Sequence, residues 1–346
     1  MKSPTKVINI PAKAHNSITQ SMTTPSINDI LMTTFGDGRV TINALQLLKY
    51  VFVSPWLVIL RFSLTWTLIF FYWLVQQLFY LTRLHPRSPL SPLRRRFLFV
   101  VFRPFCRLVL FINGYYYIRE SGVKPPLSSE YILVTAPHVG WQDIFYCLSA
   151  FPPSFIAKCS VAKIPFVGKI AISLQCIFVN RDCKDARRLV AQQIKERVTS
   201  NQNKDSELPL VVFPEGGTSN GKVLLQFKKG AFAPLLPVQP VLLKYTHKYC
   251  PQSWSMLSTF WHVLRVMSQI YNKLEVQYLP PVPPLANESA EEFAARVQQI
   301  MADKLGVPAV QHSLASKKVF TDFQNGEIER EEMEFKIEQL IGRINR

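Results

Sequence analysis

The sequence is short of acidic residues, and this shortage, set against its apolar character, excludes two classes of protein. Its 346 residues include 23 Asp and Glu against 40 Lys and Arg, which gives a net charge of +17. Charged residues make up only 18% of the chain and hydrophobic residues 48%, so the chain is not intrinsically disordered. Proteins that bind nucleic acid are usually more polar. The basic charge therefore indicates a membrane surface, and no nucleic-acid partner is expected.

The sequence also lacks the motifs of several kinds of site. None of its six cysteines forms a C-x-x-C pair, so we expect no zinc site and no disulfide framework. No G-x-S-x-G motif is present, which disfavours a serine hydrolase. A segment starting at Asp322 resembles a calcium-binding loop, but its glycine falls at position 5 and Met333 stands at position 12. Such a loop requires glycine at position 6 and glutamate at position 12, so no bound metal is expected.

A long apolar stretch near the N-terminus predicts membrane attachment. Residues 62–81 contain no charged side chain, and twenty apolar residues suffice to span a bilayer. An apolar stretch at 50–60 precedes them, separated by Arg61. One span, a two-limbed re-entrant hairpin and a buried core helix all remain open. The arginines cluster after the stretch, which places its C-terminal side in the cytosol by the positive-inside rule.

Composition divides the chain into four expected parts. Residues 1–43 are polar and rich in Ser, Thr, Asn and Pro, and we expect a flexible arm without a secretory signal. Residues 44–118 form the expected membrane-associated helical segment. Its end, from 97 on, is typical either of an interfacial segment or of the first helix or strand of the following domain. Residues 119–285 form the expected catalytic domain, and 286–346 the C-terminal helices.

The third part alternates between strand and helix patterns. Short β-rich runs are expected within the ranges 131–136, 151–158, 170–180, 208–214 and 230–245. A helical spacing of apolar residues covers 186–198, and a strong helix is expected over 288–306. The charged tail from 319 predicts a solvated helix. The alternation indicates an α/β fold, a mixed sheet with flanking helices, preceded by the membrane-embedded or re-entrant helical segment.

A histidine and an aspartate follow the first of these strands. His138 comes two residues after the strand, and Asp143 opens the next helical segment. A neutral imidazole can take a proton from a hydroxyl when a carboxylate orients it and stabilises its charged form. Five residues on one helix would point the two side chains about 140° apart. They can therefore meet only if His138 lies in the loop before the helix.

Three further segments have features of a binding site. Glu215 and Gly216 end a buried strand in a turn rich in glycine and hydroxyls, where backbone N–H groups can approach an anion. A buried Glu215 requires a ligand hydroxyl or a cation as its partner. Arg181 closes another strand and can bind phosphate through two parallel hydrogen bonds, or form a surface ion pair. Residues 236–241 are apolar and bounded by prolines, and could line an acyl groove.

Taken in their order along the chain, these four segments cover about 105 residues and resemble the glycerolipid acyltransferase family. Its members acylate glycerol-3-phosphate, lysophosphatidate and lysophospholipids from acyl-CoA. The segment 216–232, GGTSNGKVLLQFKKGAF, and the Ala-Pro before His138 are most similar to the lysophosphatidylcholine acyltransferase branch. Two positions depart from the family pattern. Gly217 stands where Thr or Ser usually follows Glu-Gly, and Cys176 stands where a glycine is usual.

The resemblance implies a role for each motif residue. It makes His138 the general base and Asp143 its partner. Arg181, Glu215 and Gly216 would hold the glycerophosphate part of the acceptor, and Thr218 would supply the hydroxyl that Gly217 lacks. No bound cofactor is implied, and acyl-CoA is the acyl donor.

We therefore expect a membrane enzyme, of the endoplasmic reticulum, that transfers an acyl chain from acyl-CoA to a lysophospholipid. The alternatives are an acyltransferase for lysophosphatidate or glycerol-3-phosphate, and a membrane-scaffolding relative with weak activity. The sequence leaves the head group, the acyl chain, the oxyanion donor and the oligomeric state open.

Overall fold

The structure is a computed structural model. It describes the residues in the ranges 27–36, 43–80, 92–125, 131–179, 186–199, 208–247, 250–254 and 258–344.

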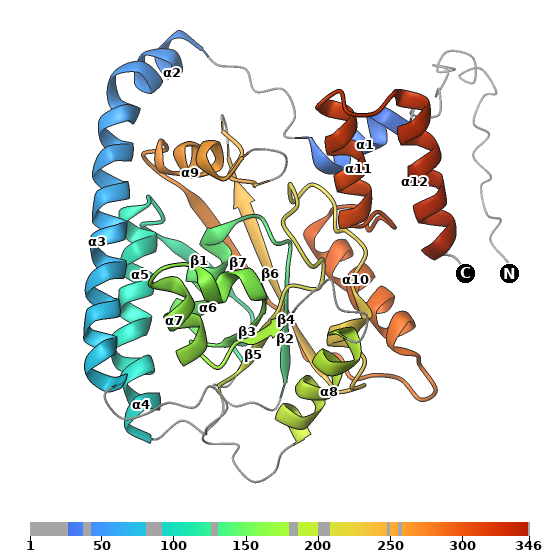
Figure 1. Ribbon diagram of the computed structural model, residues 1–346, viewed down its shortest axis with the longest axis horizontal. Coiled ribbons are helices and arrows are strands. Elements are labelled where there is room, and N and C mark those ends of the chain that lie inside the picture. Colours follow the sequence, from blue (N-terminus) through green and yellow to red (C-terminus); the bar gives the residue numbers. More distant parts are fainter. Residues whose placement is uncertain are drawn as a thin grey trace, which may run out of the picture.

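A seven-stranded sheet forms the centre of the molecule (Figure 1). Its spatial order is β1-β7-β6-β2-β5-β3-β4, and only the pair of β6 and β7 is antiparallel. The strands are β1 (Ile118–Ser121), β2 (Ile132–Ala136), β3 (Ser154–Lys158), β4 (Ile177–Val179), β5 (Leu210–Val212), β6 (Val238–Thr246) and β7 (Lys273–Tyr278). The mixed α/β sheet expected from the sequence is thereby confirmed.

Helices cover both faces of this sheet. Residues of β2 alternate between the faces: Leu133 packs with α5 (Arg103–Ile112) and α6 (Trp141–Ala150), while Ile132 packs with α8 (Ala186–Thr199) and α10 (Ala290–Leu305). This alternation follows from the two-residue period of a strand whose two faces are both covered. The shorter helices are α4 (Pro92–Phe97), α7 (Val167–Ser173) and α9 (Thr259–Met267).

The apolar N-terminal stretch forms one continuous helix. It runs through α2 (Ala44–Leu48), a π-helical turn over Lys49–Val53 and α3 (Ser54–Tyr80), and by length and composition it could cross a membrane. A hairpin between 50–60 and 62–81 is absent from the described part of this stretch. One stripe of α3 packs against the domain, and this buried stripe consists of Ser54, Arg61, Thr65, Ile69, Tyr72 and Gln76.

Arg61 explains why a charge interrupts the apolar stretch. Its guanidinium donates to the carbonyl oxygens of Met267 and Ile270, at 2.8 and 3.1 Å, and to the Tyr116 hydroxyl. These carbonyls lie at and just beyond the C-terminal end of α9, where a helix leaves acceptors without an intrahelical partner. The charge is therefore buried, and it fixes α3 to the α/β domain.

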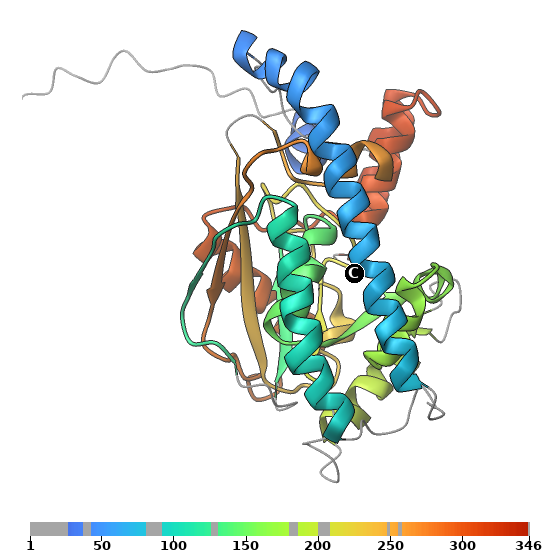
Figure 2. The same ribbon diagram turned by 90° about the vertical axis from the view of Figure 1, so that its left-hand side faces the viewer.

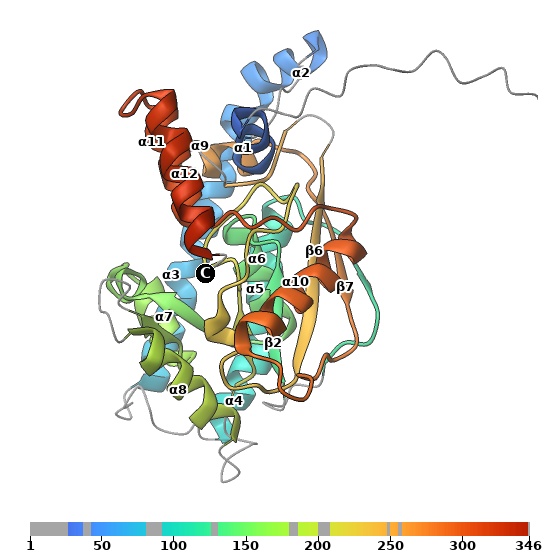
Figure 3. The same ribbon diagram turned by 90° about the vertical axis from the view of Figure 1, so that its right-hand side faces the viewer.

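The first and the last two helices of the described chain pack together in a small helical cap (Figures 1 and 3). The cap consists of α1 (Ile27–Phe35), α11 (Leu314–Gln324) and α12 (Arg330–Ile344), which share an apolar core. This differs from the flexible arm expected over 1–43, because Leu31 and Phe35 of α1 are fully buried. The prediction of a solvated helix in the tail is also wrong in part, because Met333 and Ile337 of α12 are buried. They pack in the same apolar core as α1, which supplies the apolar partner that the tail alone lacks.

For the segment from residue 97 on, the sequence left open an interfacial segment or the first helix or strand of the following domain. The structure shows the second. A π-helical turn, Leu98–Phe102, leads into α5, and β1 then pairs with β7. This end of the expected membrane segment therefore belongs to the domain itself.

Candidate active site

The loop after β2 brings His138 and Asp143 together. β2 ends at Ala136 and α6 starts at Trp141, so His138 lies in the loop and Asp143 in the first turn of α6. Nδ1 of His138 and Oδ2 of Asp143 are 2.8 Å apart. The contact required by the sequence argument is therefore present, with His138 in the loop and not on the helix.

Asp143 is held from several sides. It is fully buried, and Oδ2 also accepts the backbone N–H groups of Val139 and Gly140, at 2.6 and 2.9 Å. The hydroxyl of Tyr245 donates to Oδ1. Burial and the nearby Asp143 raise the pKa of Tyr245 well above its usual value, which keeps this hydroxyl protonated as a donor. These donors satisfy the buried carboxylate and stabilise its charge.

Tyr245 has no signal in the sequence that would connect it to Asp143. It lies near the end of β6, about one hundred residues later in the chain. Only the parallel pairing of β6 beside β2 brings the two residues together.

His138 is itself fixed in orientation. Its ring stacks on Phe213, with centroids 4.1 Å apart and planes 19° from parallel. Its side chain is 15% exposed. Because Nδ1 is committed to Asp143, Nε2 is the nitrogen left to exchange a proton with a substrate.

Glu215 joins the glycine-rich turn to the histidine loop. It is almost fully buried, and its two oxygens accept the backbone N–H groups of His138, at 2.9 Å, and of Leu225, at 3.2 Å. Ser219 N–H donates in turn to the His138 carbonyl at 2.7 Å. Burial raises the pKa of Glu215 to about 7, although these hydrogen bonds act against the rise. The structure thus gives Glu215 a positioning contact, and its predicted contact with substrate stays a prediction.

The next three residues of the turn contact side chains from Lys228 and from α11, and no sequence pattern predicts these contacts. Gly216 has φ +77°, and the Lys228 side chain occupies the place where a Cβ would stand. At Gly217 the same place is taken by Leu314 of α11. The backbone carbonyl of Thr218 accepts from Lys317 Nζ at 2.9 Å.

The cap contacts this turn through α1 as well. Asn220 donates to the carbonyls of Thr33 and Gly36, at 2.8 and 2.9 Å, at the end of α1. The turn that holds His138 is therefore bonded to both α1 and α11 of the cap.

Arg181 lies outside the described residues. The last described residue before it, Val179, ends β4, and β4 runs parallel to β3, β5 and β2. The chain thus leaves β4 at the same edge of the sheet at which His138 follows β2. Across the described ranges, no group of three or more His, Cys, Asp and Glu could hold a metal ion.

Comparison with known proteins places this site in a family. Residues 117–244 match the acyltransferase family model. A lysophospholipid acyltransferase of Xenopus tropicalis is 37% identical over 213 residues, which are 60% of this chain and 40% of that protein. A lysophosphatidylcholine acyltransferase of Drosophila melanogaster is 36% identical over 214 residues, 60% of this chain and 39% of the other. The aligned region spans about two fifths of the length of these two relatives.

A solved structure supports the fold. The acyltransferase PlsC of Thermotoga maritima, described as acting on 1-acyl-sn-glycerophosphate, superposes with a TM-score of 0.52 at 20% identity, over 73% of this chain and 95% of that one. The chain therefore carries a domain of the acyltransferase family, which extends over residues 117–244.

Proposed function

We propose that the protein is a membrane-bound acyltransferase that moves an acyl chain from acyl-CoA to the free hydroxyl of a lysophospholipid. The observation that carries the proposal is the oriented pair of His138 and Asp143 at the end of β2. The names of the relatives, a lysophospholipid acyltransferase and a lysophosphatidylcholine acyltransferase, favour this acceptor class.

The proposed mechanism uses Nε2 of His138, the ring nitrogen that Asp143 leaves free. Nε2 of His138 takes the proton of the acceptor hydroxyl as its oxygen bonds to the thioester carbonyl carbon. Asp143 accepts the Nδ1–H and stabilises the imidazolium that forms. The tetrahedral intermediate then collapses, the carbon–sulfur bond breaks, and the ester and the CoA thiolate leave. The thiolate regains a proton from the imidazolium, or leaves as such because a thiol is already fairly acidic.

Cations near the glycine-rich turn would bind the phosphate of the acceptor. The Lys228 side chain lies against Gly216, the residue that follows Glu215. We assign phosphate binding to Lys228 together with Arg181. Thr218 and the backbone of Gly216 would contact the glycerol part. Glu215 supports them indirectly by holding the loop of His138.

The geometry of α3 favours a helix that lies along the membrane surface. One side of α3 packs along its length against the domain, so a spanning α3 would draw the domain into the bilayer. The other side presents large apolar residues, among them Trp56, Ile59, Phe62 and Phe71. A helix with one apolar side free can sink into the interface without crossing it. On this proposal the catalytic domain lies in the cytosol, at the endoplasmic reticulum.

A panel of acceptors tests the proposed activity. The purified full-length protein is incubated with labelled acyl-CoA and with lysophosphatidylcholine, other lysophospholipids, lysophosphatidate or glycerol-3-phosphate. We expect acylation of lysophospholipids by the wild type and a loss of about two to four powers of ten in His138→Ala, with unchanged folding. Substantial turnover by His138→Ala would refute the mechanism. A wild type inactive on every acceptor would instead support a scaffolding relative, which the departure at Gly217 leaves open.

A further inference from the structure

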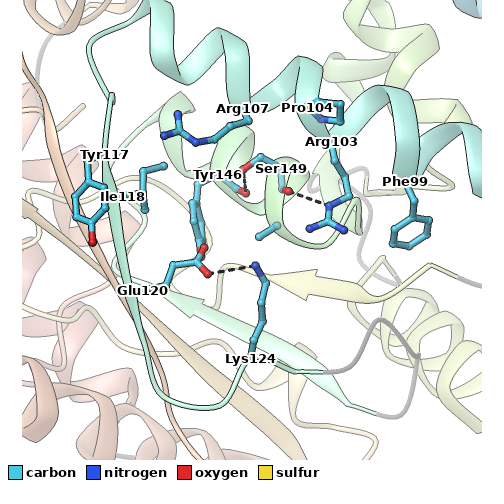
Figure 4. Close-up of a pocket in the computed structure, with 11 residues that line it drawn as sticks. Phe99, Arg103, Pro104, Arg107, Tyr117, Ile118, Glu120, Lys124, Tyr146 and Ser149 are labelled. Carbon is cyan, nitrogen blue, oxygen red and sulfur yellow. Dashed lines mark hydrogen bonds and ion pairs between the residues drawn. The ribbon is translucent and has the colours of Figure 1, made fainter.

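A cavity on the α5 side of the sheet contains basic side chains that the proposed reaction does not use. It has a volume of about 400 Å³ and lies between α5, β1 and the C-terminal half of α6 (Figure 4). Arg103 and Arg107 line it from α5, and Lys124 lines it from the chain after β1. Among the described residues that line it, Glu120 is the only acidic one. The lining therefore carries two positive charges in excess.

The cavity is separate from the catalytic pair. His138 follows β2 and stacks on Phe213, which follows β5, so the catalytic site opens on one side of β2. The cavity lies at β1, three strands away on the other side. Its α6 residues, Tyr146 and Ser149, are one to two turns beyond Asp143 on that helix.

The two arginines of this cavity differ in how many of their donors already have an acceptor. Arg107 donates to the backbone carbonyls of Tyr115 and Tyr116, at 2.9 and 2.7 Å, and so closes the turn before β1. Arg103 donates only through Nε, to the Ser149 carbonyl at 3.1 Å. In the described part of the chain both of its Nη groups are therefore available for a ligand. Figure 4 shows Arg103 reaching from α5 into the space that Lys124 enters from the opposite side.

The single acid does not neutralise these groups. One Glu120 oxygen accepts the Tyr146 hydroxyl at 2.8 Å, and the other is 3.3 Å from Lys124 Nζ. The ammonium of Lys124 also lies over the rings of Phe151 and Tyr278, 5.6 and 5.9 Å from their centroids. An ammonium has three donors, and in the described part of the chain Glu120 is its one hydrogen-bond acceptor. Two Nη groups of an arginine and an ammonium facing one space form the donor set that binds a phosphate.

The surroundings of the cavity are apolar. Tyr117, in the lining, is 67% exposed, and Val123, beside Lys124, is 83% exposed. Val100 and Phe111 of the neighbouring helical segment are also exposed. Figure 2 shows α5, the β1 edge and α3 on one face of the molecule. A phosphate bound in the cavity would thus have apolar groups beside it, on the face that we propose to contact the membrane.

We propose that this cavity binds the phosphate of an anionic phospholipid of the membrane, at a site distinct from the catalytic centre. The proposal rests on the membrane orientation of the proposed function, but it does not depend on turnover. Basic residues at a membrane surface attract anionic headgroups, and the apolar rim accommodates the glycerol and the upper acyl chains. The site would anchor this end of α5 and set the orientation of the domain.

Photo-crosslinking tests the site directly. The full-length protein is reconstituted in nanodiscs with a phosphatidate that carries a photoreactive group near the headgroup, and labelled peptides are mapped by mass spectrometry. We expect labelling within 98–125. Arg103→Gln combined with Lys124→Gln should reduce this labelling about ten-fold or more, because two charge-assisted contacts are lost. The matched control, Lys304→Gln with Lys318→Gln, removes the same charge from exposed positions elsewhere and should label as the wild type does.

Three outcomes would overturn the proposal. They are equal labelling of the cavity variant and the wild type, an equal loss in the control, and displacement of the label by excess CoA, which would assign the cavity to a nucleotide phosphate. Lys124→Gln alone leaves the Arg103–Ser149 contact intact and should still reduce labelling if the double variant fails to fold. His138→Ala protein should label normally, so a failure of the proposed function is distinguished from a failure of this site.

Discussion

Oδ2 of Asp143 accepts three donors at once: Nδ1 of His138 and the backbone N–H groups of Val139 and Gly140. This arrangement decides what an asparagine would do at this position. The NH₂ group of an asparagine is itself a donor and cannot face three donors. The amide oxygen must therefore take the place of Oδ2. Asp143→Asn should therefore keep the orientation and tautomer of His138 and remove only the charge.

We expect Asp143→Asn to lower kcat about ten-fold or more, because the imidazolium loses its counter-charge. The loss should stay below that of His138→Ala. The two losses should not add, because both act through one imidazole, and the double variant should be as slow as His138→Ala alone. Asp303→Asn, at an exposed position of α10, is the control. Additive losses in steady-state rates would show that Asp143 acts independently of His138.

The raised pKa of Glu215 predicts a pH-dependent stability. The folded protein holds this carboxyl with a pKa of about 7, against an ordinary value of 4.5. The unfolded chain therefore releases its proton first as the pH rises from 4.5 to 7, and the free energy of unfolding falls, by up to about 1.4 kcal/mol per pH unit. Above pH 7 both states are ionised and this contribution stays constant.

Denaturant titrations between pH 5 and 8 would measure this fall. Glu215→Gln cannot ionise and should lack it, whereas Glu331→Gln, at an exposed position of α12, should behave as the wild type does. The same slope in Glu215→Gln and in the wild type would assign the pH dependence to another group.

Leu314 gives a structural reason for the glycine at 217. A Cβ at that position would stand 2.5 Å from a methyl group of Leu314. Gly217→Thr, which introduces the residue usual in the family, should cost about 1–3 kcal/mol of unfolding free energy and lower activity by displacing the turn. Leu314→Ala should restore much of the loss in the same background. Gly230→Thr, where nothing lies within 4 Å of an added Cβ, is the control in thermal denaturation. A gain in activity for Gly217→Thr alone would contradict this account.

Arg181 remains a prediction from its sequence context. Arg181→Ala should raise the KM for the lysophospholipid more than that for acyl-CoA, because a phosphate ligand is lost. Arg181→Lys should recover only part of it, since an ammonium lacks the planar pair of donors. Arg188→Ala, at an exposed position of α8, should leave both constants unchanged. An unchanged KM for the lysophospholipid in Arg181→Ala would refute the assignment.

Local patterns in the sequence determined much of this protein. The runs at 131–136 and 208–214 predicted β2 and β5, because a buried strand requires apolar residues on both faces. The acidic start and glycine stop at 288–306 predicted α10. The spacing of His138 and Asp143 after a strand was sufficient to require a loop position for the histidine. Each of these inferences concerns residues close together in the chain, where geometry restricts the choices.

Only the tertiary structure decided which distant segments meet. Tyr245 reaches Asp143 because β6 pairs with β2. β1 and β7 were not among the expected strands, although β7 alternates between buried and partly buried residues, and only the pairing of β1 with β7 joins these distant segments. The sequence alone predicts a polar arm where α1 forms and a solvated helix in the tail, because neither segment can bury an apolar face by itself. Their packing against the turn at 216–225 depends on the sheet, which brings the first and the last described helices to one place. No local pattern records such a contact.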